Sequence, residues 1–180
     1  MKSKPNILTK DQILNQLKTA RKQSEQPFLA MFSSWLGGIV TDPEYMILPI
    51  DDHLVHRGDG VFEAMKFYDR RLYLADEHLE RLYSSAKAIF LPVPYKKQEL
   101  LYLIEATLAA AKVDTATIRM FVSRGPGGFT PNPYDSCGSQ LYIIITAPKP
   151  FDPKKYEAGV KVGISKIPMK DQFFATIKMT

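Results

Sequence analysis

The alternation of apolar and polar residues is clearest between residues 60 and 90. From 61 to 68 every second residue falls on one face, which predicts a strand. One face would carry Val61, Glu63, Met65 and Phe67, and the other Phe62, Ala64, Lys66 and Tyr68. A turn at 69–71 and a short strand at 72–74 follow. Apolar residues then recur every three or four positions, at Leu79, Leu82, Tyr83, Ala86 and Ile89, which predicts a helix with Asp76 as its N-cap.

Similar patterns extend over the rest of the chain. Thr9 is a candidate cap for a helix over about 10–23, and a second core helix is expected at 96–111. Strands are expected at 28–36, 39–40, 45–50, 116–124 and 140–146, the last so apolar that it should be central in the sheet. A loop rich in Gly and Pro spans 125–138. These elements indicate an α+β fold in which two helices cover a mostly antiparallel sheet.

Changes in composition divide the chain into four parts. Residues 1–26 have the pattern of a basic helical extension, and 27–147 that of a small N-terminal domain. Residues 148–158 contain Pro148, Pro150 and Pro153, which is typical of a stiff linker. New strand structure, the start of a second and larger domain, is expected in 159–180.

Charge and cysteine content narrow the function. Of the net charge of +5, +4 lies in residues 1–26, so the remainder is nearly neutral and a nucleic-acid-binding face is not expected. Cys137 is the only cysteine, which fits a reducing compartment. The first residues contain no apolar run of signal-peptide length, and no stretch is long enough for a membrane span. We therefore expect a cytoplasmic protein without a nucleic-acid or membrane partner.

Several residues are candidates for chemistry on pattern alone. Arg81 lies beside the apolar helix stripe, so packing does not explain it, and Arg119 interrupts an otherwise apolar strand. The three histidines have no convincing metal spacing, so no metal site is predicted. The run from Gly125 to Gly128 lacks the Lys-Ser/Thr ending of a nucleotide-binding phosphate loop.

Five motifs together resemble a known family. They are Arg57-Gly58-Asp59-Gly60-Val61-Phe62-Glu63, Glu77-His78-Leu79-Glu80-Arg81-Leu82 with Ser85-Ala86, Ile118-Arg119, Ser123-Arg124-Gly125 and Thr176-Ile177-Lys178. In this order they resemble the N-terminal half of the class IV pyridoxal-phosphate aminotransferases, over roughly residues 27–180. That family includes branched-chain and D-amino-acid aminotransferases and aminodeoxychorismate lyase. The fold implied is the family's small domain.

The resemblance implies a pyridoxal 5'-phosphate cofactor and two residues that hold it. Lys178 matches the lysine that bonds to the cofactor aldehyde and later moves the substrate's α-proton; the alternative is a surface lysine. Arg81 matches the arginine that binds the cofactor phosphate, a role suited to its planar donors. The alternative for Arg81 is an exposed pairing with Glu77.

The resemblance also suggests residues for substrate binding. Phe62 matches an aromatic position that faces the substrate, although core packing is a rival role, and Lys66 shares its strand face. Arg57, Arg119 and Arg124 are candidates to hold the substrate carboxylate. Arg124 is the weakest of the three, because arginines at strand ends are often solvated.

The leading functional prediction is a transaminase acting between an amino acid, branched-chain or D-, and a 2-oxo acid. One alternative is a lyase releasing pyruvate and 4-aminobenzoate, and another is a truncated, non-catalytic interaction domain. The sequence ends two residues after Lys178, whereas the family continues through a larger domain. That domain supplies the carboxylate that pairs with the cofactor's ring nitrogen. The 180 residues alone are therefore expected to be inactive, with Lys178 on a frayed terminus.

Assembly is predicted from apolar residues near that terminus. Ile164, Ile167, Phe173 and Phe174 would expose apolar surface in a chain of this length. Family members build each active site from two subunits, so the resemblance points the same way. We expect a homodimer.

Overall fold

The computed structural model describes residues 5–20, 27–149, 152–167 and 171–180. Its sheet strands are β1 (Phe28–Ser33), β2 (Gly38–Val40), β3 (Gly60–Tyr68), β4 (Arg71–Leu72), β5 (Ala116–Ser123) and β6 (Gln140–Thr146). Its α-helices are α1 (Lys10–Ala20), α2 (His53–Arg57), α3 (Ala75–Ala88), α4 (Lys97–Ala111), α5 (Pro153–Ala158) and α6 (Gln172–Ala175). Short 3₁₀ helices occupy Pro43–Tyr45 and Pro133–Asp135.

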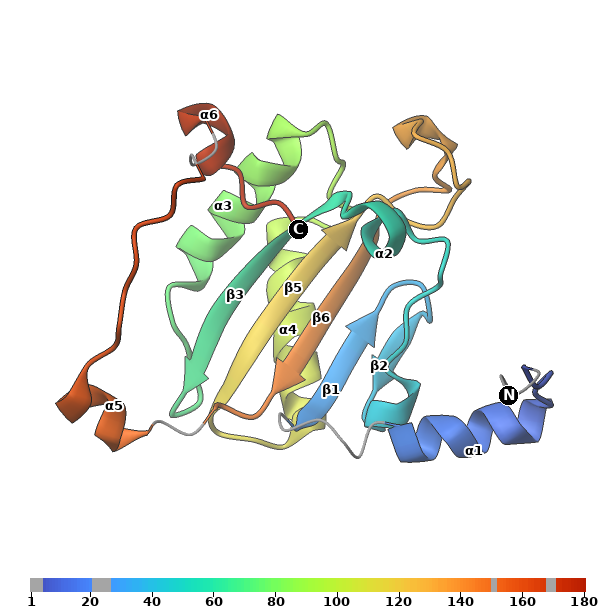
Figure 1. Cartoon of the computed structure of the whole chain (residues 1–180), viewed down its shortest axis with the longest axis horizontal. Coiled ribbons are helices and arrows are strands. Elements are labelled where there is room, and N and C mark those ends of the chain that lie inside the picture. The colour runs from blue at the N-terminus through green and yellow to red at the C-terminus, as the bar shows by residue number, and fades with distance from the viewer. Residues whose placement is uncertain (1–4, 21–26, 150–151, 168–170) are drawn as a thin grey trace.

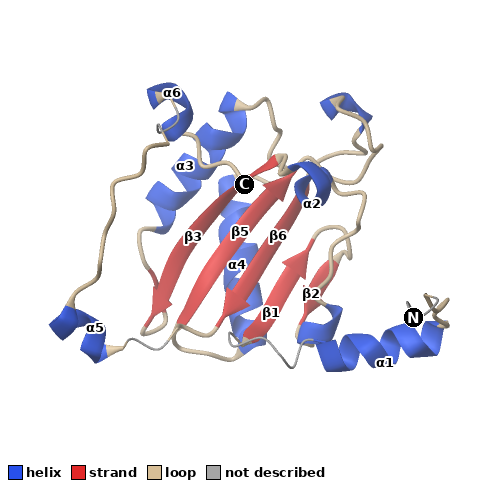
Figure 2. Cartoon of the chain, in the orientation of Figure 1, coloured by secondary structure: helices blue, strands red, loops and turns tan. Residues whose placement is uncertain are grey.

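The strands form one six-stranded antiparallel sheet in the order β2-β1-β6-β5-β3-β4 (Figure 1 and Figure 2). The apolar strand β6 is central, as its composition predicted. β4 pairs only with the last two residues of β3, Phe67 and Tyr68. The opposite end of β3, from Gly60 to Glu63, pairs with β5 on one side. Its other side is an edge that β4 does not reach.

Helices α3 and α4 lie on one face of the sheet, behind it in Figure 1. Their apolar stripes pack against alternate residues of the strands, which explains why both periodicities were readable in the sequence. The buried core includes Leu79, Leu82, Leu100, Ile104, Ile118, Met120, Leu141, Ile143 and Ile145. The expected α+β fold, an antiparallel sheet with two covering helices, is confirmed.

The two faces of β3 separate the candidate residues. Val61, Glu63 and Met65 point to the helix-covered face and are buried. Phe62 and Lys66 lie on the other face, and Arg119 joins them because it pairs in register with Ala64. Figure 1 shows this second face toward the viewer.

Several predicted elements are wrong in detail. The expected strand at 45–50 is irregular chain after the 3₁₀ helix at Pro43–Tyr45, and β1 ends at Ser33 instead of residue 36. Residues 159–167 form neither strand nor helix. Leu74, with φ of 50°, takes the N-cap position of α3, so Asp76 lies in the first turn instead. Helix α2 was not expected at all.

Other predictions reach beyond the described residues. The predicted end of the first helix, at 21–23, lies outside them, as do residues 150–151 of the expected linker. Pro153 begins α5, so the linker prediction covers a short helix. The domain boundaries stay a prediction. Within the described part of the chain, the helices are too short or too polar to cross a bilayer.

Candidate active site

The last four residues add to the free edge of β3. Val61 and Met179 form an antiparallel bridge, and the Phe62 amide donates to the Lys178 carbonyl at 3.1 Å. The Thr180 amide donates to the Gly60 carbonyl, also at 3.1 Å. Ser85 of α3 accepts from the Lys178 amide at 3.1 Å. The expectation of a frayed terminus at Lys178 is therefore wrong, because strand pairing and α3 hold its backbone.

Local sequence explains why this edge is open to the terminal residues. Gly58 ends α2 in the left-handed conformation, with φ of 67°, and its carbonyl accepts from the Thr180 hydroxyl at 2.6 Å. At Gly60 a Cβ atom would lie 2.7 Å from the Val122 carbonyl oxygen, so the chain can pass here only without a side chain. The Gly-Asp-Gly turn thus places β3 against both β5 and the terminal segment.

Three side chains meet at Glu63, which is completely buried. Arg81 donates to it with Nε at 2.6 Å from Oε1 and Nη2 at 2.7 Å from Oε2. His78 Nδ1 lies 2.8 Å from Oε2, and Lys178 Nζ lies 3.6 Å from the same atom. We call Glu63, His78, Arg81 and Lys178 the Glu63 cluster.

The cluster has a net positive charge although its centre is a carboxylate. Burial alone would raise the pKa of Glu63, but the hydrogen bonds from Arg81 and His78 and the charges of Lys178 and Arg81 outweigh burial and lower this pKa. Glu63 is thus ionised near neutral pH. Since its folded-state pKa is depressed, its contribution to stability is present above the unfolded pKa and is lost as pH falls through the folded value.

Lys178 also faces Phe62. Its Nζ lies 5.0 Å from the centroid of the Phe62 ring, a cation–π distance, and its side chain is 28% exposed. Phe62 in turn stacks on Phe121 of β5, with ring centroids 6.0 Å apart. The structure thus brings Phe62, Lys178 and Arg81 together at the start of β3. Phe62 lies on one face of the strand, Arg81 binds Glu63 on the other face, and the Lys178 amine faces both.

Lys66 and Arg119 are exposed on the sheet face that carries Phe62, farther along the strands. Neither has an ion pair within the described residues. They are cations available to a ligand that lies over this face.

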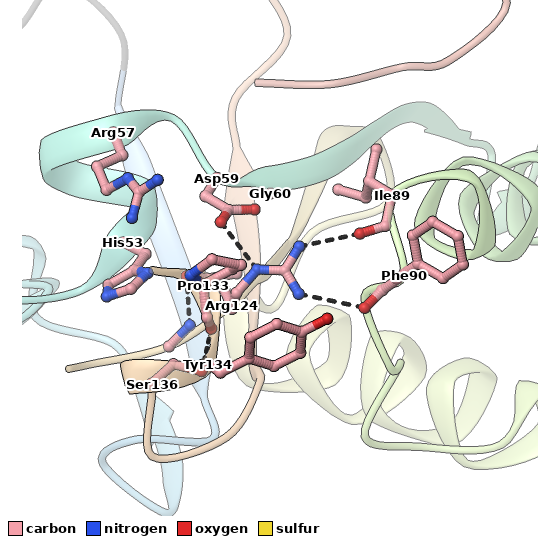
Figure 3. Close-up of polar contacts among 12 residues, drawn as sticks. His53, Arg57, Asp59, Gly60, Ile89, Phe90, Arg124, Pro133, Tyr134 and Ser136 are labelled. Atoms are coloured by element: carbon pink, nitrogen blue, oxygen red, sulfur yellow. Dashed lines mark hydrogen bonds and ion pairs between the residues drawn. The ribbon is translucent and has the colours of Figure 1, made fainter. Parts of the chain in front are cut away.

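Arg57 and Arg124 have partners within the chain, and Figure 3 shows those of Arg124. Arg124 donates to Asp59 at 2.8 Å and to the Ile89 and Phe90 carbonyls after α3, at 3.0 and 3.2 Å. Arg57 donates to the Thr130 and Pro131 carbonyls at 2.6 and 2.8 Å. Both arginines therefore connect segments of this chain, and their role at a substrate carboxylate stays a prediction.

A second polar network is buried at the ends of β5 and β6. Asp52 is completely buried and accepts from the Tyr142 hydroxyl at 2.7 Å, from the Ser123 hydroxyl and from the Leu54 amide at 2.9 Å. Burial, followed by the bond to Asp52, raises the pKa of Tyr142, so it remains a neutral donor. The network fixes the start of α2 and hence the Gly58 turn.

Sequence reasoning missed Glu63, His78 and Asp52 as functional or structural residues. Glu63 carried a usable signal, because it is a charged residue between Val61 and Met65 on the face predicted to be buried. Asp52 had no comparable signal, since its partners lie 71 and 90 residues away. Arg81 pairs with Glu63 and not with the predicted alternative, Glu77. The described residues contain no group of three or more potential metal ligands.

The family model for class IV aminotransferases, "Amino-transferase class IV", matches residues 60–180, which include β3, the Glu63 cluster and the terminal segment. The chain belongs to this family. This confirms the resemblance on which the roles of Arg81 and Lys178 rest, and places the Glu63 cluster within the matched region. The roles themselves stay predictions.

Curated relatives include transaminases of two substrate classes. The chain is 38% identical over 173 residues to a chloroplastic D-amino-acid transaminase from Arabidopsis thaliana, covering 96% of this chain and 45% of that protein. It is 32% identical over 138 residues to a branched-chain-amino-acid aminotransferase, named as putative, from Methanocaldococcus jannaschii, covering 75% and 47%. The chain thus spans about half the length of these relatives.

Solved structures agree with the fold. A branched-chain amino acid aminotransferase from Escherichia coli aligns with a TM-score of 0.60 at 25% identity, over 68% of this chain and 40% of that one. A hypothetical aminotransferase from Mycobacterium tuberculosis, in its PLP-bound form, aligns with a TM-score of 0.54 at 28% identity, over 66% and 39%. This second protein is therefore a structural relative that binds pyridoxal phosphate.

Proposed function

We propose that these 180 residues form the N-terminal part of a pyridoxal-phosphate-dependent transaminase that moves an amino group between an amino acid and a 2-oxo acid. One observation carries the proposal. The amine of Lys178 is held at the edge of β3, over Phe62 and within 3.6 Å of the carboxylate that also binds Arg81. An amine at this edge and a guanidinium from α3, both at one carboxylate, are what a phosphorylated aldehyde needs at its two ends.

The residues present fit that cofactor. Arg81 is half exposed, and its Nε and Nη2 bind Glu63 while Nη1 has no hydrogen bond to a described residue. The guanidinium can therefore bind a phosphate oxygen without leaving Glu63. When bound, the cofactor withdraws electrons from the substrate's α-carbon.

Lys178 Nζ would take the proton from the substrate α-carbon and return it, because a lysine amine in a partly apolar site can act as both base and acid. Phe62 and Phe121 would exclude water from one side of that amine. Ser85 and the pairing with β3 hold the Lys178 backbone, so only the side chain needs to move.

Arg119 and Lys66 are the residues best placed to bind the substrate carboxylate. Both are exposed on the face that carries Phe62, and both are without ion pairs in the described structure. Arg57 and Arg124 are less suited, since each already donates to carbonyls within the chain.

D-amino acids are the favoured substrate class. The supporting observation is the similarity to the Arabidopsis D-amino-acid transaminase, which extends over 96% of this chain, against 75% for the Methanocaldococcus branched-chain relative. The cofactor's ring nitrogen would be bound by a second domain, which begins after the 148–158 segment and extends past residue 180. Exposed Ile164, Ile167 and Phe174 support a homodimer; the Phe173 side chain lies outside the described part.

The substrate proposal is tested with a polypeptide in which these residues are continued by the second half of the Arabidopsis relative. Amino transfer to a 2-oxo acid should be faster from D-alanine than from L-leucine, because the similarity to the D-amino-acid transaminase extends over 96% of the chain. Pyruvate release from aminodeoxychorismate is measured in parallel. Faster transfer from L-leucine would assign the branched-chain class, and pyruvate release without amino transfer would assign the lyase.

A further inference from the structure

Glu63 is the only member of the Glu63 cluster that touches the other three. Its Oε2 atom lies within 2.8 Å of Arg81 and His78 and 3.6 Å from Lys178. All three partners come from other parts of the chain: His78 and Arg81 from α3, and Lys178 from the terminal segment. A buried carboxylate at this point therefore sets the relative positions of the guanidinium and the amine.

A purely structural role would not need this arrangement. To neutralise a buried glutamate, the bidentate bond from Arg81 is sufficient. Lys178 is held independently through its backbone by Phe62 and Ser85, so its amine is not required to fasten the terminus. Its Nζ nevertheless faces Glu63 and the Phe62 ring, where charge on the amine is stabilised by both.

His78 completes the surroundings of the carboxylate. Arg81 has only donors, and its Nη2 also lies 3.3 Å from His78 Nδ1. The 2.8 Å contact to Glu63 is the shorter one, so we assign the imidazole proton to Nδ1, donating to Oε2.

We propose that Glu63 is a positioning residue that holds the Lys178 amine and the Arg81 guanidinium in place relative to each other, ready for a phosphorylated aldehyde. This inference rests on the proposed function, because only that function gives the amine a reaction. Without Glu63 the amine would face Arg81 and His78 with no anion between them. The amine would then be released from its ion pair and would react more readily with an acylating reagent.

The test measures the reactivity of each lysine toward an amine-acylating reagent, from pH 6 to 10, in the 180-residue chain without cofactor. Glu63→Gln should raise the acylation rate of Lys178 near pH 8 by about five- to tenfold, the size of one partly exposed charge interaction. The pH midpoint of its labelling should move down, while other lysines are unchanged. Glu80→Gln is the matched control, since Glu80 lies on α3 and pairs with Lys97 instead.

Two comparisons distinguish an effect of Glu63 on the Lys178 amine from an effect of Glu63 on folding. In concentrated urea all variants should label Lys178 at one rate, and Glu63→Asp, which keeps the charge, should restore the pH midpoint toward that of the original chain. Should Glu63→Gln fail to fold, the original chain with and without concentrated urea gives the comparison: folding should slow the acylation of Lys178 by a larger factor than that of the exposed Lys87. An unchanged rate and midpoint at Lys178 in the folded variant would overturn the inference.

Failure of this inference and failure of the proposed function give different results. Labelling with pyridoxal 5'-phosphate and borohydride reports on the function, and acylation reports on Glu63. A change in acylation with no phosphate-directed labelling would support the positioning role and refute the cofactor role. The reverse result would retain the cofactor site and remove Glu63 from it.

Discussion

Replacing Lys178 with alanine should lower amino transfer by about 10³-fold or more, because the variant loses both the bond to the cofactor and the proton carrier. The measurement uses the polypeptide continued by the second half of the Arabidopsis relative. Folding should be little affected, since Lys178 contacts β3 and α3 mainly through backbone atoms. Cofactor should still bind through its phosphate, by way of Arg81.

The control for this prediction is Lys87→Ala, which removes an exposed lysine from α3. It should retain the full rate. If Lys178→Ala keeps more than a tenth of the activity, another group moves the proton, and the assignment of Lys178 as the catalytic residue is wrong.

Replacing Asp52 with alanine should destabilise the chain by about 3–5 kcal/mol, the cost of breaking a buried charged network. The substitution leaves the hydroxyls of Tyr142 and Ser123 and the amide of Leu54 without their acceptor. An unsatisfied buried donor costs about 1–3 kcal/mol. Urea unfolding followed by circular dichroism measures the change.

The comparison variant is Asp42→Ala, because Asp42 is exposed and makes no side-chain capping bond. Its free energy of unfolding should stay within about 0.5 kcal/mol of the original. A loss below about 1 kcal/mol for Asp52→Ala would show that the network reorganises, since intact buried networks cost more to break. The Gly58 turn would then be fixed by other contacts.

The sequence predicted the fold where one face of an element is buried. α3 and α4 each have a continuous apolar face, and the buried face of β3 is apolar except for Glu63, so these faces indicate the type and orientation of each element. The strand predicted at 45–50 failed because this segment packs as irregular chain with Met46 buried. Apolar composition marks burial, but it does not distinguish a strand from a loop covered by neighbours.

Helix α2 shows a different limit. Its five residues are too few to display a helical period, and its stability comes from Asp52, whose side chain caps it while binding distant strands. Such a helix depends on tertiary contacts, which no local pattern records.

The candidate site also combines residues that the sequence predicted with contacts that only the structure shows. Lys178 and Arg81 came from motifs, whereas their juxtaposition at Glu63 depends on the terminal segment pairing with the distant edge of β3. Thr180 and Gly60, which meet there, are 120 residues apart in sequence. Arg57 and Arg124 illustrate the converse, because their motifs mark them as important and only the structure shows their present bonds to backbone carbonyls.

Lys178 and Arg81 are proposed to form one site for a phosphorylated aldehyde, and this proposal can be tested on the chain itself. The 180-residue chain is treated with a limited amount of pyridoxal 5'-phosphate and reduced with borohydride, and the modified lysines are mapped by mass spectrometry. Reduction traps the adduct, so no stable complex is needed. Pyridoxal, which lacks the phosphate, and the Arg81→Lys variant are treated alongside.

We expect pyridoxal 5'-phosphate to modify Lys178 at least about threefold more than any other lysine, because Arg81 directs the phosphate to this edge. The preference should disappear with pyridoxal and fall in Arg81→Lys, which cannot make the planar two-point contact. Modification centred on another lysine, or a preference for Lys178 that survives both changes, would contradict the proposed site.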